Sequence, residues 1–233
     1  FIMSLNFNYV KYATDRLLIA RTTANDFETL ISQFTNNNMY YYMKPVVYFE
    51  KEDQIKNHFI QQNTSSIDYS IKLKNENLQV IGQVGVYFAG IQGEIMDVYY
   101  HIAEKYQKQG YATEATVPFI RELFERVPQA KVLKIDYCES NIASKKIAMK
   151  ICDDILKNHP DYKKVDIPPF VDTYTFANND KNNNKDIYYY RSNDKEQYLA
   201  YPKGYLRKTE ETIAGVMIYK PENSINKDNT VNN

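Results

Sequence analysis

The chain has 233 residues, of which 43% are hydrophobic, and its 29 Lys and Arg residues balance 29 Asp and Glu residues. This composition can build the core of one generous domain and excludes a disordered chain, while the neutral balance excludes a global attraction to nucleic acid or membrane. No apolar run approaches the roughly 20 residues that span a bilayer, so we expect a soluble, cytoplasmic protein with no nucleic acid and no membrane as partner.

The first part of the chain predicts strands and helices in alternation. Residues 16–21 favour a strand, and apolar residues recur at helical spacing over residues 27–34. A second helical stretch is expected at residues 52–62. Three strands are expected next, at residues 67–73, 78–88 and 94–102. Because short turns separate these three strands, we expect an antiparallel meander.

The central part predicts two helices separated by a strand at residues 132–138. The first has an apolar stripe from Ala115 to Val127, although Pro118 should kink it or weaken its first turns. The second begins after Asn141, a candidate helix cap. Its apolar stripe consists of Ala143, Ile147, Ala148, Ile151, Cys152 and Ile155. The two cysteines, Cys138 and Cys152, are too few for a disulfide framework, and we interpret them as buried thiols.

The most informative motif is Gln107-Lys108-Gln109-Gly110-Tyr111-Ala112, which lies between an expected strand and an expected helix. The chain has only 7 glycines, so Gly110 indicates a position where the backbone needs one. A tight strand-to-helix turn leaves amide N–H groups unpaired at the positive end of the helix dipole, which favours an anion such as pyrophosphate. The motif therefore predicts a phosphate site.

Residues 97–114, together with residues 141–144, resemble the GNAT superfamily of acetyl-CoA-dependent N-acetyltransferases. Within it, the chain is most similar to the branch that acetylates the N-termini of ribosomal proteins. A weaker likeness at residues 14–19 adds a third motif in order, so the resemblance covers roughly residues 14–157. The matching positions are Gln107, Gly110 and Ala112 in the first motif and Asn141 and Ser144 in the second.

The resemblance implies an α+β (mixed α/β) fold, with a central, mostly antiparallel twisted sheet flanked by helices. It implies acetyl-CoA as the cofactor and no metal. A bulge at roughly Tyr100 to Ala103 should turn backbone amides toward the pantetheine arm and the thioester carbonyl. The residues expected to contact the cofactor are Tyr100, His101, Ile102, Ala103, Gln107, Lys108, Gln109, Gly110, Tyr111, Ala112, Thr113, Asn141 and Ser144. The side-chain amide of Asn141 would meet the pantetheine arm, and the same residue can also be an ordinary helix cap. Candidates for the outer phosphate are Lys105, Lys108, Lys145 and Lys146, which are otherwise ordinary solvated side chains.

Asp97 is the candidate general base, because it matches the position where the branch often has a glutamate. Alternation places Asp97, Tyr99 and His101 on one face of the expected strand. An α-amino group has a pKa of about 7.7 to 8.0 and needs little help to lose its proton near neutral pH. Glu94 and His101 are the reserves. The alternatives are a solvated or structural carboxylate at Asp97 and a packed strand residue at His101.

The superfamily's usual general acid is a tyrosine seven residues after the motif asparagine, where this chain has Ala148. Ser144 matches the serine proposed for that role in the ribosomal-protein branch. A serine can also orient the sulfur without donating a proton, and a small residue on a packing face is an ordinary finding. Because an aliphatic thiol has a pKa of about 8.5, thiolate departure needs little assistance and catalysis can be mainly positioning.

Beyond residue 157 the resemblance fades. Three strands are expected at residues 173–176, 187–191 and 213–219, the last closing the sheet. We interpret residues 168–208 as a tyrosine-rich insertion, either a hairpin that covers the sheet edge or a flap that recognises the acceptor. Residues 1–220 should form a single GNAT domain, and residues 221–233 a polar tail.

The expected function is an acetyl-CoA-dependent N-acetyltransferase that acts by direct attack of a primary amine on the thioester, most readily a protein or peptide N-terminus. One alternative is a small-molecule amine such as a polyamine, an amino acid or an aminoglycoside-like compound. Another is an acyl-CoA-binding module without turnover. An acidic pocket would favour a small cation, and an open groove with backbone partners would favour a peptide. We expect a monomer or a homodimer.

Overall fold

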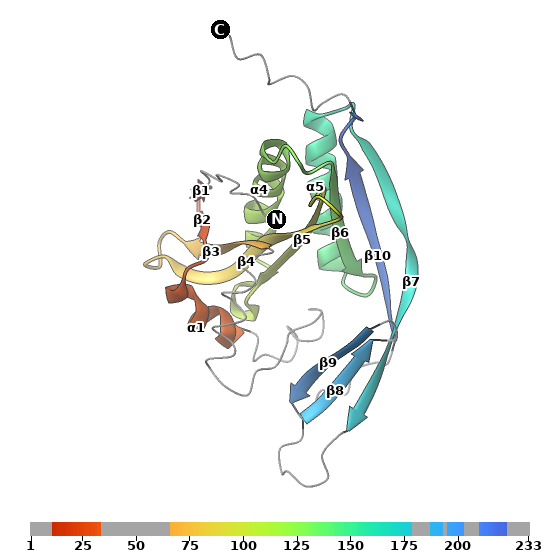
Figure 1. The fold of residues 1–233 in the computed structure, drawn as a ribbon. Helices are drawn as coiled ribbons and strands as arrows, with labels where there is room; N and C mark the ends of the chain where they lie inside the picture. The colour runs from red at the N-terminus through yellow and green to blue at the C-terminus, as the bar shows by residue number, and fades with distance from the viewer. Residues whose placement is uncertain (1–10, 34–65, 179–186, 193–194, 203–209, 223–233) are drawn as a thin grey trace.

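The computed structural model is built around one mixed sheet, in which ten described strands follow the order β1-β2-β3-β4-β5-β6-β10-β7-β8-β9 (Figure 1). The structure describes residues 11–33, 66–178, 187–192, 195–202 and 210–222. The helix expected at residues 52–62 and nearly all of the expected polar tail lie outside these ranges.

The first five strands pair antiparallel in chain order, which confirms the predicted meander. They are β1 (Lys11–Ala13), β2 (Leu17–Arg21), β3 (Ser66–Leu73), β4 (Gln79–Ala89) and β5 (Ile95–Ile102). The helix α1 (Ala24–Gln33) follows β2. β1 was not predicted because a strand of three residues is too short to show a periodic pattern.

The next unit is a crossover that makes β5 and β6 parallel. After β5 come a short 3-10 turn, η1 (Glu104–Tyr106), the helix α4 (Tyr111–Arg126) and the strand β6 (Val132–Cys138), and then the helix α5 (Ile142–Asn158). Since each helix follows the carboxyl end of its strand, α4 and α5 begin at the same end of the parallel pair. In α/β sheets this end is where ligands bind.

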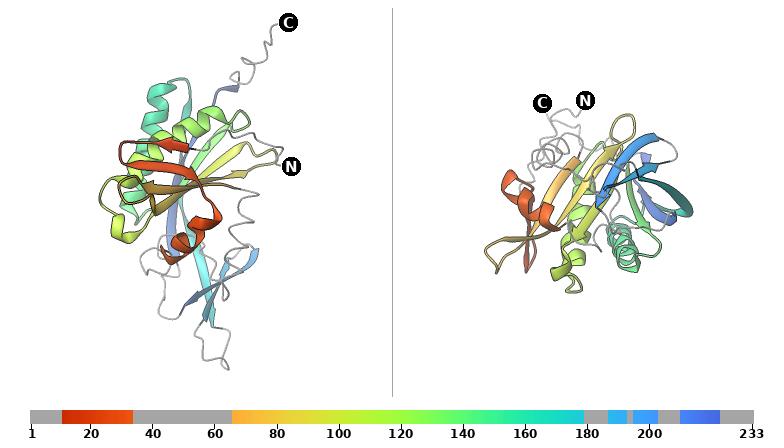
Figure 2. Two further views of the ribbon diagram at one scale, coloured as in Figure 1. Left: turned by 90° about the vertical axis from the view of Figure 1, so that its left-hand side faces the viewer. Right: turned by 90° about the horizontal axis from the view of Figure 1, so that it is seen from below.

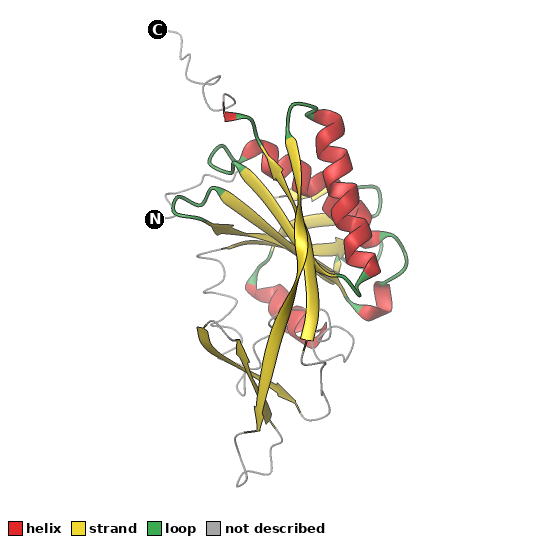
Figure 3. Ribbon diagram, turned by 90° about the vertical axis from the view of Figure 1, so that its right-hand side faces the viewer, coloured by secondary structure: helices red, strands yellow, loops and turns green. Residues whose placement is uncertain are grey.

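The helices cover opposite faces of the sheet, as the side chains of β3 show. The Tyr69 ring lies 4.7 Å from the ring of Phe119 in α4. The next residue, Ser70, donates its hydroxyl to Asp26 of α1 at 3.0 Å. Figure 3 shows α4 and α5 together on one side, where the main hydrophobic core lies. The face toward α1 is instead polar.

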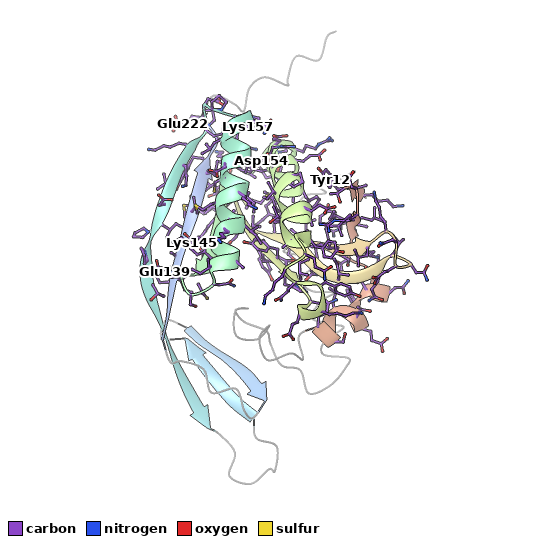
Figure 4. All side chains as sticks on the ribbon, turned by 180° about the vertical axis from the view of Figure 1, so that it is seen from behind. Tyr12, Glu139, Lys145, Asp154, Lys157 and Glu222 are labelled. Atoms are coloured by element: carbon purple, nitrogen blue, oxygen red, sulfur yellow. The ribbon has the colours of Figure 1, made fainter. Side chains whose placement is uncertain are left out.

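The two long helices pack side by side, as Figure 4 shows, and an ion pair of 2.8 Å joins Arg121 of α4 to Asp154 of α5. The stripe predicted for α4 is buried, and α5 buries Ala148, Ile151, Cys152 and Ile155. Ala143, which we expected in the α5 stripe, is exposed because it lies in the first turn, beyond the edge of the sheet contact. None of the described helices combines the length and the apolarity needed to cross a membrane.

The last strand, β10 (Glu210–Tyr219), takes an interior place in the sheet between β6 and β7 (Lys163–Asn178). β7 begins ten residues before its predicted start at residue 173. Its pairing with β10 shifts between Ile213 and Gly215, where Pro168 and Pro169 of β7 lie opposite the single residue Ala214, so β7 has one extra residue. Proline has no N–H to give to a ladder, so a bulge on a strand with one open side accommodates both.

The distal part of β7 continues into an antiparallel ribbon with β8 (Ile187–Ser192) and β9 (Lys195–Pro202). Figures 1 and 2 show this ribbon extending away from α4 and α5, past the end of β10. β8 was predicted and β9 was not. Whether the ribbon protects an edge or recognises an acceptor stays a prediction.

Candidate active site

The parallel pair β5 and β6 is joined over only three residue pairs, from Ile95–Val132 to Asp97–Lys134. Beyond them, residues 98–102 of β5 and 135–138 of β6 face each other without pairing, although β4 and β10 bond their outer sides. We call this part the unpaired section. The Ile102 and Cys138 carbonyls in it accept from Gln107 and Asn141, and other backbone groups on the inner sides of the two strands can bond an extended ligand that itself contains amides.

The prediction of a bulge at roughly Tyr100 to Ala103 is wrong, because the pairing of β5 with β4 contains no bulge there. That ladder runs without a shift from Ile95 to Ile102, and the amide of Ala103 continues it by donating to the Ile81 carbonyl at 2.8 Å. The register shift lies instead between β3 and β4, at Ile71 and Lys72. The inner side of β5 is therefore accessible to a ligand because its pairing with β6 ends at Asp97.

A phosphate cradle begins where β5 ends, in the cofactor loop, which we define as residues 103–110. Gly110 is the N-cap of α4, with φ of 83°, and no side chain in the described part of the chain caps this helix. The first-turn amides of Tyr111, Ala112 and Thr113 therefore remain available at the positive end of the helix dipole. Lys108 also has a left-handed backbone, with φ of 62°. The phosphate site stays a prediction, which this geometry allows.

Arg16, in the turn that precedes β2, binds the cofactor loop, and no motif in the sequence indicates this role. Its Nη2 donates to the Gln109 carbonyl at 3.1 Å, and its guanidinium lies 4.3 Å from the centre of the Tyr111 ring. The same guanidinium pairs with Glu114 at 2.6 Å, and the Thr14 hydroxyl donates to that carboxylate. Partial burial raises the pKa of Glu114, but the hydrogen bonds from Thr14 and Arg16 outweigh it and lower the pKa. The start of α4 is thereby fixed to the first large strand.

The other polar side chains near the loop shape it or remain exposed. Gln107 donates its side-chain amide to the Ile102 carbonyl at 2.9 Å and its backbone N–H to Glu104, so these donors close the loop. Lys105 lies 5.0 Å from the centre of the Tyr106 ring. Figure 4 places Lys145 near the start of α5. Lys105, Lys108, Lys145 and Lys146 are all exposed and remain candidates for the outer phosphate.

Asn141 and Ser144 lie at the start of α5, beside the unpaired section. Asn141 is the N-cap, and its side-chain oxygen accepts the Ser144 amide at 3.1 Å. The Tyr100 hydroxyl lies 3.0 Å from the Ser144 carbonyl and 3.1 Å from its Oγ. Burial raises the pKa of Tyr100 to about 12. A phenol from β5 thus reaches this helix start, while Ala148 is fully buried in the core.

Asp97 lies on the opposite, polar face of β5 and shares a lysine with a second carboxylate. Lys134 of β6 lies 3.3 Å from Asp97 and 2.5 Å from Asp136. Burial raises the pKa of Asp97, and Lys134 opposes this effect. One Asp136 oxygen is buried without a hydrogen-bond partner among the described residues. The cluster remains partly open to solvent, as a site for proton transfer requires.

The two reserve bases are used elsewhere. Glu94 precedes β5, at the end away from the unpaired section, and accepts the backbone N–H of Gln92 at 2.8 Å. Hydrogen bonds from the turn backbone lower its pKa. His101 is buried, and its Nε2 lies 3.1 Å from the Gln33 side-chain oxygen. Burial lowers the pKa of His101 to about 3, so it is a neutral packed residue.

Family comparison agrees with this geometry. The model of the family described as Acetyltransferase (GNAT) domain matches residues 16–151, which are more than half of the chain. The chain is a GNAT acetyltransferase. Its cofactor is accordingly acetyl-CoA, and the residues described above fit it: free amides at Gly110 suit a pyrophosphate, and the unpaired section suits the amide-bearing pantetheine arm. No curated protein sequence matches the chain closely.

Solved structures share the GNAT fold at low sequence identity. The ribosomal-protein-S5-alanine acetyltransferase of Vibrio fischeri has a TM-score of 0.61 and 15% identity over 91% of this chain and 100% of its own. A GNAT-family acetyltransferase of Bacillus anthracis has a TM-score of 0.55 and 12% identity, covering 90% and 98% of the two chains. Spermidine N-acetyltransferase of Vibrio cholerae, solved with CoA and spermine, has a TM-score of 0.52 and 11% identity, covering 88% and 97%.

Proposed function

We propose that this GNAT acetyltransferase transfers an acetyl group to a primary amine, with a protein or peptide N-terminus as the preferred acceptor. The observation that carries the proposal is the unpaired section of β5 and β6 beside two helix starts, with the Asp97–Lys134–Asp136 cluster on the polar face of the same strands. It offers a route for the acceptor on the face opposite α4 and α5.

In the proposed mechanism, Asp97 accepts the proton that the acceptor ammonium loses as its nitrogen becomes the nucleophile. Acetyl-CoA supplies an activated acetyl group as a thioester. Burial keeps the pKa of Asp97 above that of a free aspartate, which makes the carboxylate a better proton acceptor, while the charge of Lys134 acts in the opposite direction. For an α-amine with a pKa of about 7.7 to 8.0, this assistance suffices near neutral pH.

On the other side of the strands, the N–H groups of the unpaired section stabilise negative charge on the carbonyl oxygen. Ser144 orients the sulfur from the start of α5, and Tyr100 holds Ser144 in place. The raised pKa of Tyr100 makes it a hydrogen-bond donor that retains its proton. These residues hold the reacting groups in position, which is the larger part of the proposed catalysis.

The test is thiol release from acetyl-CoA with a panel of peptides and small amines. Asp97→Asn should lower kcat about 100-fold at pH 7 and much less at pH 9, where the acceptor loses its proton unaided. KM for acetyl-CoA should stay unchanged. Asp166→Asn, at a carboxylate with a 75% exposed side chain on β7, is the matched control. Full activity of Asp97→Asn at pH 7 would contradict the role of Asp97, and no turnover of any amine by the native chain would contradict the function.

A further inference from the structure

Asp68 is a buried carboxylate that has no cation beside it, among the described residues, on its own face of the sheet. It is 1% exposed, and its hydrogen-bond donor is the Ser66 hydroxyl at 3.1 Å. Lys72 lies on the same face of β3, four residues further along the strand, and is paired with Asp26 at 2.7 Å. Arg21 lies over the Tyr69 ring, on the opposite face. A buried charge in this situation is costly to the fold and marks a candidate site for a ligand.

Tyr99 supplies a second polar atom that the described residues leave without a partner. Gly85 lies between Asp68 of β3 and Tyr99 of β5 in one cross-strand row. A Cβ at Gly85 would lie 2.3 Å from the Tyr99 hydroxyl oxygen, so the phenol occupies the space that this glycine leaves. The Tyr99 hydroxyl is buried and makes no hydrogen bond within the described residues. The hydroxyl therefore lies over Gly85, between Tyr99 and Asp68 in this row.

Tyr87 lies beside Asp68 and Tyr99 and connects them to the Asp97–Lys134–Asp136 cluster. It pairs with Asp97 across the strands, and its ring centre lies 4.7 Å from that of Tyr99. Burial and the charges of Asp68 and Asp97 raise its pKa to about 12, so the phenol stays neutral. Tyr87 is 37% exposed. Two aromatic rings and a carboxylate are the groups that hold an organic cation.

The position of Asp68 determines which charge it can hold. Asp68 lies on β3, and the unpaired section begins on β5, two strands away. Neighbouring strands are about 4.8 Å apart, which puts Asp68 roughly 10 Å from the reacting centre. It is therefore too far to take the proton of the attacked nitrogen.

We propose that Asp68, Tyr87 and Tyr99 form a subsite for a second positive charge of the acceptor, an ammonium roughly 10 Å from the nitrogen that is acetylated. The inference rests on the proposed amine acetyltransferase function and narrows it to acceptors with two cationic groups. The ammonium donates to the Asp68 carboxylate and the Tyr99 oxygen, and the Tyr87 ring shields it. Such a charge can come from a linear diamine or from a lysine near the N-terminus of a peptide.

The kinetic test compares diaminobutane, diaminohexane and diaminooctane with monoamines of equal length, and lysine-containing peptides with their norleucine analogues. For the native chain, the acceptor with a suitably spaced second charge should have a KM at least about tenfold lower than its uncharged match. Asp68→Asn and Tyr99→Phe should each remove most of that difference, whereas Asp166→Asn should preserve it. The acceptor class that shows the KM difference, diamines or lysine-containing peptides, identifies where the second charge comes from. Equal KM values for every charged and uncharged pair would overturn the subsite.

A binding measurement separates this inference from the function. Carbon NMR of the Asp68 carboxyl carbon, with diaminohexane added to the acetyl-CoA-bound protein, should show a chemical-shift change that saturates. Tyr99→Phe should weaken this binding while the carboxyl signal confirms a folded protein. A saturating change without turnover would refute the enzyme function and keep the subsite. Turnover with no change at Asp68 at saturating diamine would refute the subsite alone.

Discussion

Gly110 sets the geometry of the cofactor loop through its backbone alone. Its φ of 83° lies in the left-handed region, where a Cβ costs about 1 to 2 kcal/mol. The nearest atom to a new Cβ would be Arg16 Nη2 at 3.5 Å, an ordinary contact. The demand for glycine here is therefore conformational, as the scarcity of glycine in the chain indicates.

Gly110→Ala should raise KM for acetyl-CoA about tenfold, because an alanine shifts the amides that the phosphates need. Gly93→Ala is the control, since Gly93 has φ of 71° in the turn before β5, and a Cβ there meets only Phe88 at 3.5 Å. Both variants should lose similar stability in urea unfolding, but only Gly110→Ala should lose cofactor affinity by calorimetry. Equal affinities would contradict the cradle.

Asp68 makes the stability of the fold depend on pH. Burial raises its pKa from 3.8 to about 6, against the hydrogen bond from Ser66 and the charge of Arg21. Between these values the folded protein keeps a proton that the unfolded chain has lost, so the free energy of unfolding falls as pH rises. The total loss above pH 6 is about 3 kcal/mol.

Asp68→Asn should therefore gain stability relative to the native chain as pH rises from 4 to 7.5, by up to about 3 kcal/mol. Urea unfolding of both proteins at the two pH values measures this difference. Asp166→Asn removes an exposed carboxylate in the same charge class and serves as the reference. A difference that does not change with pH would show that Asp68 is not a strained buried charge.

At the scale of elements, α5 is held at its first turn by contacts that also belong to the site. Asn141 caps the helix, and Tyr100 of β5 bonds the Ser144 that Asn141 fixes. A cap loss costs about 1 kcal/mol. The same side-chain amide was predicted to meet the pantetheine arm, and the two roles are compatible because the cap uses only its oxygen.

Asn141→Ser separates the two roles. Serine caps a helix nearly as well as asparagine, so the melting temperature should stay close to that of the native chain, while Asn141→Ala should lose about 1 kcal/mol. If the amide N–H bonds the cofactor, Asn141→Ser should still raise KM for acetyl-CoA about tenfold. An unchanged KM would leave Asn141 as a cap only.

Elements with a clear period were predictable from the sequence, and elements at edges were not. β6 was predicted residue for residue, and β3, β4 and β5 lie within one residue of their predicted bounds. β7 was predicted late because Pro168 and Pro169 look like a break, whereas a bulge with one open side tolerates them. In β3, alternation with Ser66, Asp68 and Ser70 resembles a solvated face, but these residues are buried. Contacts between distant segments, such as Arg16 with Glu114, leave no local signal.

For the whole molecule, the ribbon of β7, β8 and β9 is the part that the family likeness does not explain. Asp172 and Glu211 are cross-strand partners, so a two-residue turn can join the chain there. Replacing residues 173–210 with Asn-Gly should leave KM for acetyl-CoA unchanged, because the proposed cofactor contacts lie in β5, α4 and α5. If the ribbon recognises the acceptor, acceptor KM should rise. If it protects an edge, acceptor KM should stay and light scattering should report association.

The interior position of β10 gives the protein a late folding step. β6 borders the unpaired section on one side and depends on residues 213–219 for its other neighbour, a separation of about eighty positions along the chain. During synthesis, the half of the sheet that carries the cofactor loop emerges before the strand that braces it. Long-range pairing of this kind slows folding and leaves β6 temporarily as an open edge. A nascent chain stalled before residue 210 should therefore bind acetyl-CoA poorly, even though every residue of the cradle has already been made.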